Sequence, residues 1–106
     1  MTAETRQSEA LDRAAVMSCL SAHSAELARF HVRSLELFGS TVKGKATDES
    51  DIDLLVTFDG AIDLLSFIEL EEMLGDFLGR KVDLVPRESV KPLLAESIFS
   101  EAVRVY

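Results

Sequence analysis

The sequence is poor in the residues that build several common kinds of functional site. Cys19 is the only cysteine among 106 residues, so neither an intramolecular disulfide nor a cysteine metal cluster can form. Tryptophan is absent, and Lys and Arg total 11 against 19 Asp and Glu, for a formal net charge of −8. An acidic chain without clustered basic and aromatic residues is repelled by nucleic acid. We therefore expect no direct nucleic-acid partner.

Long apolar runs are missing as well. No segment approaches the roughly 20 apolar residues that cross a bilayer, and Glu4, Arg6 and Glu9 stand where a signal peptide has its apolar core. We therefore expect a cytoplasmic protein with no membrane partner. With 47% hydrophobic residues over this length, the composition is that of one globular domain, residues 1–106, of which residues 1–8 are expected to be frayed.

Alternating apolar and polar residues predict three strands, over residues 32–38, 51–58 and 81–86. A helix is predicted before the first strand, over residues 8–30, and another between the second and third, over residues 63–78. This order is typical of an α/β (α+β) domain, a small mixed sheet flanked by helices.

The helices are defined by apolar stripes and by their ends. The first stripe comprises Val16, Leu20, His23, Leu27 and Phe30, and the second comprises Leu64, Phe67, Ile68, Leu74 and Leu78. We interpret His23 as a boundary residue of the core rather than a catalytic group. Gly79 is predicted to stop the second helix. Ser89 is predicted to be the N-cap of a last helix whose first turn accepts Pro92.

An apolar stretch closes the chain, and two interpretations of it stay open. It packs on the domain's own sheet, or it belongs to an interface with a partner. Its apolar residues are Ile98, Phe99, Val103, Val105 and Tyr106.

Two carboxylates open the second predicted strand. Side chains alternate along a strand, so Asp51 and Asp53 project from one face, about 6.6–6.8 Å apart along the strand, while Ile52 and Leu54 enter the core. Aspartate is depleted in strands, and two in alternation repel each other unless a cation lies between them. Ligands that offer only oxygen favour Mg²⁺ or Mn²⁺. The pair therefore predicts a magnesium site.

Asp83 is the natural third ligand. It lies on the opposite face of its strand from Val82 and Leu84, so it joins the Asp51 and Asp53 face if the two strands are neighbours. Three carboxylates on one face fit a two-metal site for phosphoryl or nucleotidyl transfer, with ions roughly 3.5–4 Å apart. The alternative is an ordinary solvated aspartate.

A glycine–serine turn ends the first predicted strand, and ten residues separate Ser40 from Asp51. Gly39 has no Cβ, so the backbone can approach a phosphate closely, and Ser40 offers a hydroxyl donor. Lys43 is the nearest cation for a triphosphate, in a predicted helical turn over residues 41–43 that Gly44 closes. Alone such a turn is ordinary; beside the aspartates it predicts nucleotide binding.

The segment from Phe38-Gly39-Ser40 to Asp51-Ile52-Asp53-Leu54-Leu55-Val56, with its ten-residue spacer, resembles the signature of the polymerase-beta-like nucleotidyltransferase superfamily. The small size and the ending Glu101–Tyr106 resemble its minimal branch, the MNT domains, which are antitoxin partners of HEPN-domain ribonuclease toxins. The resemblance covers nearly the whole chain after residue 8.

This resemblance implies the polymerase-beta-like fold and an adenylyltransferase that uses ATP as co-substrate. It implies Mg²⁺ held by Asp51, Asp53 and Asp83, and a phosphate tail held by Gly39, Ser40 and Lys43. In this family AMP is transferred to a tyrosine hydroxyl of the HEPN toxin, with which the chain would form a hetero-oligomer. Asp83 is our candidate for the general base.

One departure keeps alternatives open. Family members commonly have Gly-Ser-Arg-x-Arg-Gly after the first strand, whereas this chain has Thr41 and Lys43 at the arginine positions. Lysine lacks the bidentate fork of arginine, so its grip on a triphosphate is looser. The second hypothesis is therefore a non-catalytic antitoxin that neutralises its toxin by binding. A third is transfer to a small molecule of the aminoglycoside type.

Overall fold

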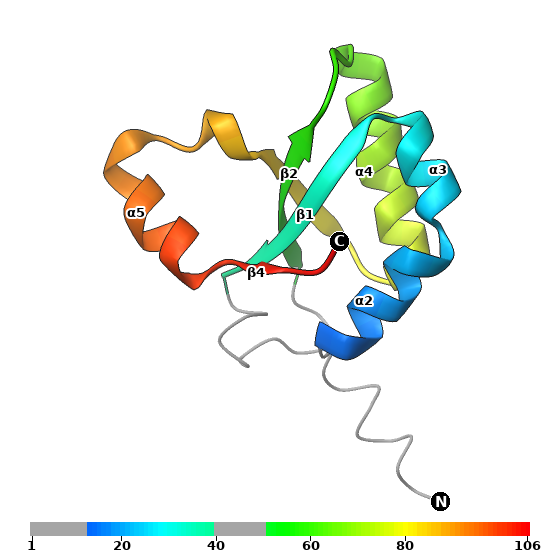
Figure 1. Cartoon of the computed structure of the whole chain (residues 1–106), viewed down its shortest axis with the longest axis horizontal. Helices are drawn as coiled ribbons and strands as arrows, with labels where there is room; N and C mark the ends of the chain where they lie inside the picture. The colour runs from blue at the N-terminus through cyan, green and yellow to red at the C-terminus, as the bar shows by residue number, and fades with distance from the viewer. Residues whose placement is uncertain (1–12, 40–50) are drawn as a thin grey trace, which may run out of the picture.

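The computed structural model describes residues 13–39 and 51–106 of the chain. Within these ranges, four strands form one mixed sheet in the order β3-β2-β1-β4 (Figure 1). β1 (Val32–Phe38) pairs antiparallel with β2 (Ile52–Phe58), and β2 pairs parallel with β3 (Val82–Pro86). The three predicted strands are thus confirmed, with β2 and β3 each beginning one residue later than predicted.

A fourth strand, β4 (Val103–Arg104), was not predicted. It pairs antiparallel with the end of β1, where Glu36 faces Arg104 and Leu37 faces Val103. Val105, which follows it, is only 3% exposed and joins the core. The end of the chain therefore packs on the domain's own sheet, as the first of the two interpretations held.

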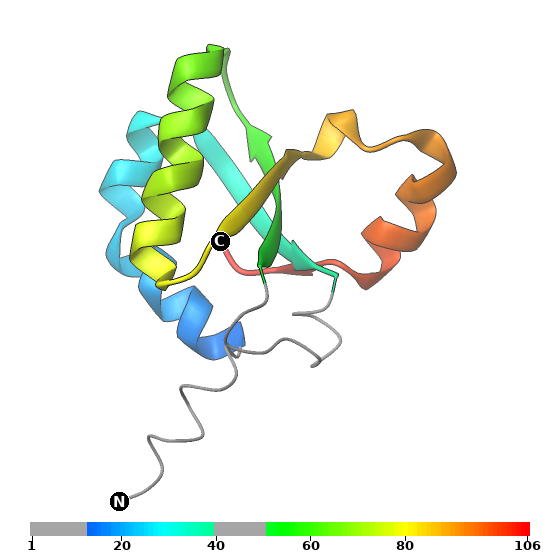
Figure 2. The same ribbon diagram turned by 180° about the vertical axis from the view of Figure 1, so that it is seen from behind.

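The core lies between one face of the sheet and three helices: α2 (Arg13–Ala22), α3 (Ser24–Arg29) and α4 (Leu64–Leu78). These helices stand together on one side of the sheet, whereas α5 (Pro92–Glu101) stands apart on the other (Figures 1 and 2). Alternation along the strands turns one set of apolar side chains toward the three helices. The buried strand residues of this core are Val32, Leu35, Leu37, Ile52, Leu54, Val56, Val82 and Leu84.

The prediction of one helix over residues 8–30 is wrong in its middle. The chain makes two helices that meet at His23, whose N–H donates to the Leu20 carbonyl at 3.0 Å, a tighter turn than the α-helix allows. The His23 ring stacks on Phe77 of α4, with centroids 3.6 Å apart and planes at 9°. This contact with a residue far along the chain stabilises the break between the two helices. Residues 8–12 of the predicted helix lie outside the described residues.

Helix α4 has the predicted ends and part of the predicted stripe. Asp63 caps its N-terminus, accepting from the Ser66 N–H at 2.8 Å, and Gly79 ends it with φ +71°. Leu70 and Leu74 are its fully buried residues, whereas Leu64 is 73% and Ile68 41% exposed. Of the predicted stripe, Leu74 belongs to the core and Phe67 and Leu78 pack against it, so the stripe is confirmed in part, and Leu70 joins it.

The last helix also begins later than predicted. Ser89 ends a short 3₁₀ helix, η1 (Arg87–Ser89), and α5 starts at Pro92 after Lys91. Proline is suited to the first helical position because its φ is already helical and its missing N–H would have no partner there. No helix in the described part of the chain is long and apolar enough to cross a membrane.

Candidate functional site

The strand pairing brings the glycine turn to the aspartates. In the antiparallel register Phe38 faces Asp53, so Gly39 follows directly beside that carboxylate. Gly39 has φ +77°, and a Cβ built on it would collide with the Asp53 carboxylate, whose Cγ would lie 3.3 Å away. Glycine is required here both by the backbone conformation and by the close approach.

Asp83 lies next to Asp53, as predicted. The parallel register pairs the two residues directly, and paired residues on neighbouring strands point to the same face. Val82 and Leu84 are buried on the other face, while Asp83 is exposed and Asp53 half-buried. The sheet therefore places two carboxylates side by side, within reach of Gly39 at the end of β1.

Asp51 precedes β2 and is exposed. Next to it, the Ile52 N–H donates to the Lys81 carbonyl at 2.9 Å, which fixes the start of β2 against the residue before β3. The three aspartates influence one another electrostatically. Partial burial raises the pKa of Asp53, and the negative charges of Asp83 and then Asp51 raise it further. A cation at this place would relieve that repulsion.

The described residues do not form a complete metal cage. Among residues 13–39 and 51–106, no three His, Cys, Asp or Glu side chains are gathered closely enough to hold an ion by themselves. Mg²⁺ seldom needs such a cage, because it is usually held by one or two carboxylates together with substrate phosphates and water. The adjacent Asp53 and Asp83 supply such a carboxylate pair. The predicted nucleotide ligands Ser40 and Lys43, with the turn over residues 41–43, lie outside the described residues.

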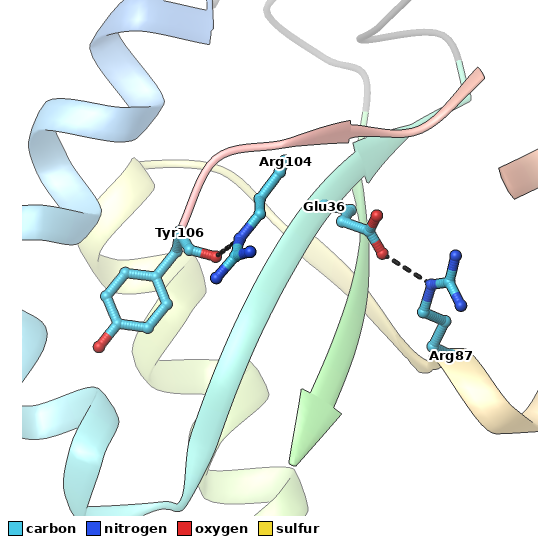
Figure 3. A network of polar contacts seen from close by, with 4 residues as sticks. All are labelled: Glu36, Arg87, Arg104 and Tyr106. Atoms are coloured by element: carbon cyan, nitrogen blue, oxygen red, sulfur yellow. Dashed lines mark hydrogen bonds and ion pairs between the residues drawn. The ribbon is translucent and has the colours of Figure 1, made fainter. Parts of the chain in front are cut away.

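A second polar group on the same face was missed by the sequence reasoning. Glu36 accepts from Arg87 Nε at 3.0 Å, and the Arg87 guanidinium lies 3.9 Å from the centroid of the Phe99 ring. Figure 3 shows Glu36 on β1 and Arg87 on η1 pointing toward each other. Alternation alone puts Glu36 on the same face as Phe38, but nothing local links it to an arginine 51 residues away.

Comparisons with known proteins show the family of this chain. The model of the nucleotidyltransferase domain family matches residues 20–105. The protein adenylyltransferase MntA of Thermococcus cleftensis is 47% identical over 91 residues, which cover 85% of this chain and 92% of that protein.

Solved structures are similar too. A protein assigned as a minimal nucleotidyltransferase superposes with a TM-score of 0.73 at 32% identity, covering 88% of this chain and 95% of that one. A chain in a crystal structure of a toxin–antitoxin complex with AMP-PNP superposes with a TM-score of 0.66 at 25% identity. That match covers 81% of this chain and 71% of the other.

Proposed function

Because the chain belongs to the nucleotidyltransferase domain family, we propose that it is a Mg²⁺-dependent protein adenylyltransferase that acts as an antitoxin. It transfers AMP from ATP to a tyrosine hydroxyl of a HEPN ribonuclease toxin, with which it forms a hetero-oligomer in the cytoplasm. The observation that carries this proposal is the pairing of Asp53 with Asp83 beside Gly39, where a side chain would collide with the Asp53 carboxylate. Both the adenylyltransferase relative and the nucleotide-bound toxin–antitoxin structure support it.

In the proposed reaction the tyrosine oxygen attacks the α-phosphorus of ATP, and the bond to the β-phosphate oxygen breaks, releasing pyrophosphate. Asp83 accepts the proton of the hydroxyl as general base. It suits this role because it is the exposed member of the pair, and so the one that a protein acceptor reaches from outside. Gly39 lets the phosphate chain approach the backbone, and Ser40 and Lys43 are proposed to donate to it.

Asp53, Asp83 and Asp51 would hold the metal. Their donor set is carboxylate oxygen, which suits Mg²⁺, and a two-ion arrangement is the form we propose. The bound metal would supply charge neutralisation on the phosphates. The pKa of Asp53 is raised first by partial burial and then by the charges of Asp83 and Asp51, and a cation bound here would offset both effects.

The test is mass spectrometry of the toxin after incubation with this protein, ATP and Mg²⁺. The toxin is the product of a neighbouring gene or is obtained by pulldown. We expect the toxin to gain one or more AMP units on tyrosine. Asp53→Asn should reduce the rate by at least about a hundredfold, whereas Asp76→Asn, an equivalent change at an exposed position of α4, should leave it unaltered.

A second candidate function rests on the turn sequence. Thr41 and Lys43 replace the arginines common in the family, which favours a binder that neutralises its toxin without transferring AMP. A stable complex with no change in the mass of the toxin would select this candidate. A third candidate, transfer to a small-molecule acceptor, would be selected by AMP transfer in an acceptor screen without any protein partner.

A further inference from the structure

A cavity of about 770 Å³ lies between the end of β2, the loop after it, η1 and α5. This volume falls within the range of about 300–1,000 Å³ that is typical of small-molecule sites. Asp53 and Asp83 do not line it, so it is separate from the carboxylate pair. Its lining is largely apolar with charged groups at one wall, and it includes Thr57, Phe58, Ile62, Pro86, Arg87 and Phe99.

The cavity opens on the same face of the sheet as the carboxylates. Thr57 follows Asp53 by four residues on β2, so alternation turns both side chains to that face, and the strand separates them by about 13 Å. A nucleotide spans this kind of distance between its α-phosphate and the far edge of its base. Phosphates held at Asp53 would therefore place the nucleoside in the cavity.

The surface between the carboxylate pair and the cavity is formed by side chains that contact one another. Leu55, two residues after Asp53, is fully buried but is not part of the core on the helix-covered face. Its partner in the antiparallel register is Glu36, which holds Arg87 at 3.0 Å (Figure 3). Arg87 in turn lies over Phe99, with its guanidinium carbon 3.9 Å from the ring centroid. Glu36 thus fixes a guanidinium between the carboxylates and the cavity.

We propose that this cavity binds the nucleoside part of ATP, with Arg87 and Phe99 forming the wall against which the base stacks. Guanidinium and aromatic planes are the surfaces on which proteins stack nucleobases. The positive charge of Arg87 also favours the neighbouring phosphates. An apolar side chain of a protein partner is a weaker candidate, because it would gain nothing from a guanidinium placed between the cavity and the carboxylates. The inference rests on the proposed function, since it assumes that ATP binds at Asp53.

The test compares the binding of two ligands, ATP and inorganic tripolyphosphate, each in the presence of Mg²⁺. Binding is measured by calorimetric titration of the full chain. The wild type should bind ATP at least about tenfold more tightly than tripolyphosphate. Ala95→Trp fills the cavity from α5 and should remove this difference while tripolyphosphate binds as before. Leu93→Trp is the matched control, because Leu93 lies on the same helix, is 95% exposed and does not line the cavity.

Four outcomes would overturn the inference. If Ala95→Trp binds ATP as tightly as the wild type, or if the wild type binds both ligands equally, the cavity does not hold the nucleoside, while the proposed function stands. If the wild type binds no ATP at all, the proposed function fails and this inference falls with it. If Ala95→Trp also loses binding of tripolyphosphate, the same two titrations are repeated with Phe99→Ala. A selective loss of ATP binding supports the inference, and an unchanged preference for ATP contradicts it.

Discussion

The carboxylate of Asp53 lies in the space that a side chain on Gly39 would fill. These two residues belong to different strands, and the antiparallel register that sets Phe38 opposite Asp53 brings them together. The end of β1 is therefore shaped around the carboxylate, and the turn cannot change without moving it.

Gly39→Ala should lower both stability and activity. Its φ of +77° costs an alanine roughly 1–2 kcal/mol, and the added methyl group displaces the Asp53 carboxylate. We expect AMP transfer to fall by at least about tenfold, since misplacing a catalytic group by about 1 Å can cost far more. Thermal unfolding and the transfer assay measure the two effects.

Gly79→Ala separates the effect of the backbone conformation from the effect of displacing the Asp53 carboxylate. Gly79 has φ +71°, but a Cβ there would meet no atom within 4 Å. It should lower the stability by a similar amount and leave transfer unaltered. Equal losses of activity in both variants would mean that the effect at Gly39 is one of folding and not of the site.

The strands and the carboxylate pair could be predicted because each depends on local alternation. Val82 and Leu84 are buried on one face of β3, so Asp83 has to lie on the other face. Two strands that are joined by one helix are commonly parallel neighbours in a sheet. The close approach of Gly39 to Asp53 followed from the same pairing. The sequence alone therefore predicts which residues lie together at the centre of the candidate site.

What could not be predicted depends on contacts between distant residues. The break at His23 is held by Phe77, and the pairing of β4 depends on the end of β1. Arg87 meets Glu36 across 51 residues, and the same turn that carries Arg87 delays the last helix from Ser89 to Pro92. Periodicity within one segment contains no information about such pairs.

Glu71→Gln should weaken the edge of the sheet. The Glu71 carboxylate on α4 accepts from the Leu84 N–H of the edge strand β3 at 2.8 Å, which satisfies a backbone donor that no strand covers. Replacing the charged acceptor with an amide should lower the free energy of unfolding by about 1 kcal/mol, measured by denaturant titration. Glu72→Gln, at an exposed neighbouring position, should change nothing. Equal stability of the two variants would show that the Leu84 bond contributes little.

Asp63→Ala should shorten α4 and lower the melting temperature at pH 7. The side chain accepts from the Ser66 N–H, and this bond holds the pKa of Asp63 below its usual value of 3.8. A lowered pKa means that the carboxylate stabilises the fold above pH 3.8, and that this contribution disappears as the pH falls through the lowered value. The difference between wild type and variant should therefore shrink in acid. Glu69→Ala, exposed on the same helix, should show a smaller difference at pH 7.

Asp53→Asn should lower AMP transfer but raise the stability of the ligand-free protein, relative to wild type, as the pH increases. Partial burial and the charges of Asp83 and Asp51 raise the pKa of Asp53 above 3.8. The protonated form is thus favoured in the folded state, and this contribution to stability is lost as the pH rises through the raised value. The melting temperature of the variant, relative to wild type, should increase from pH 4 to pH 8, although the transfer rate falls at least about a hundredfold. Mg²⁺ with ATP should reverse the order, because ligand binding stabilises only the wild type. A variant that is less stable than wild type at pH 8 without ligand would mean that Asp53 is held by an attractive partner rather than crowded by other carboxylates.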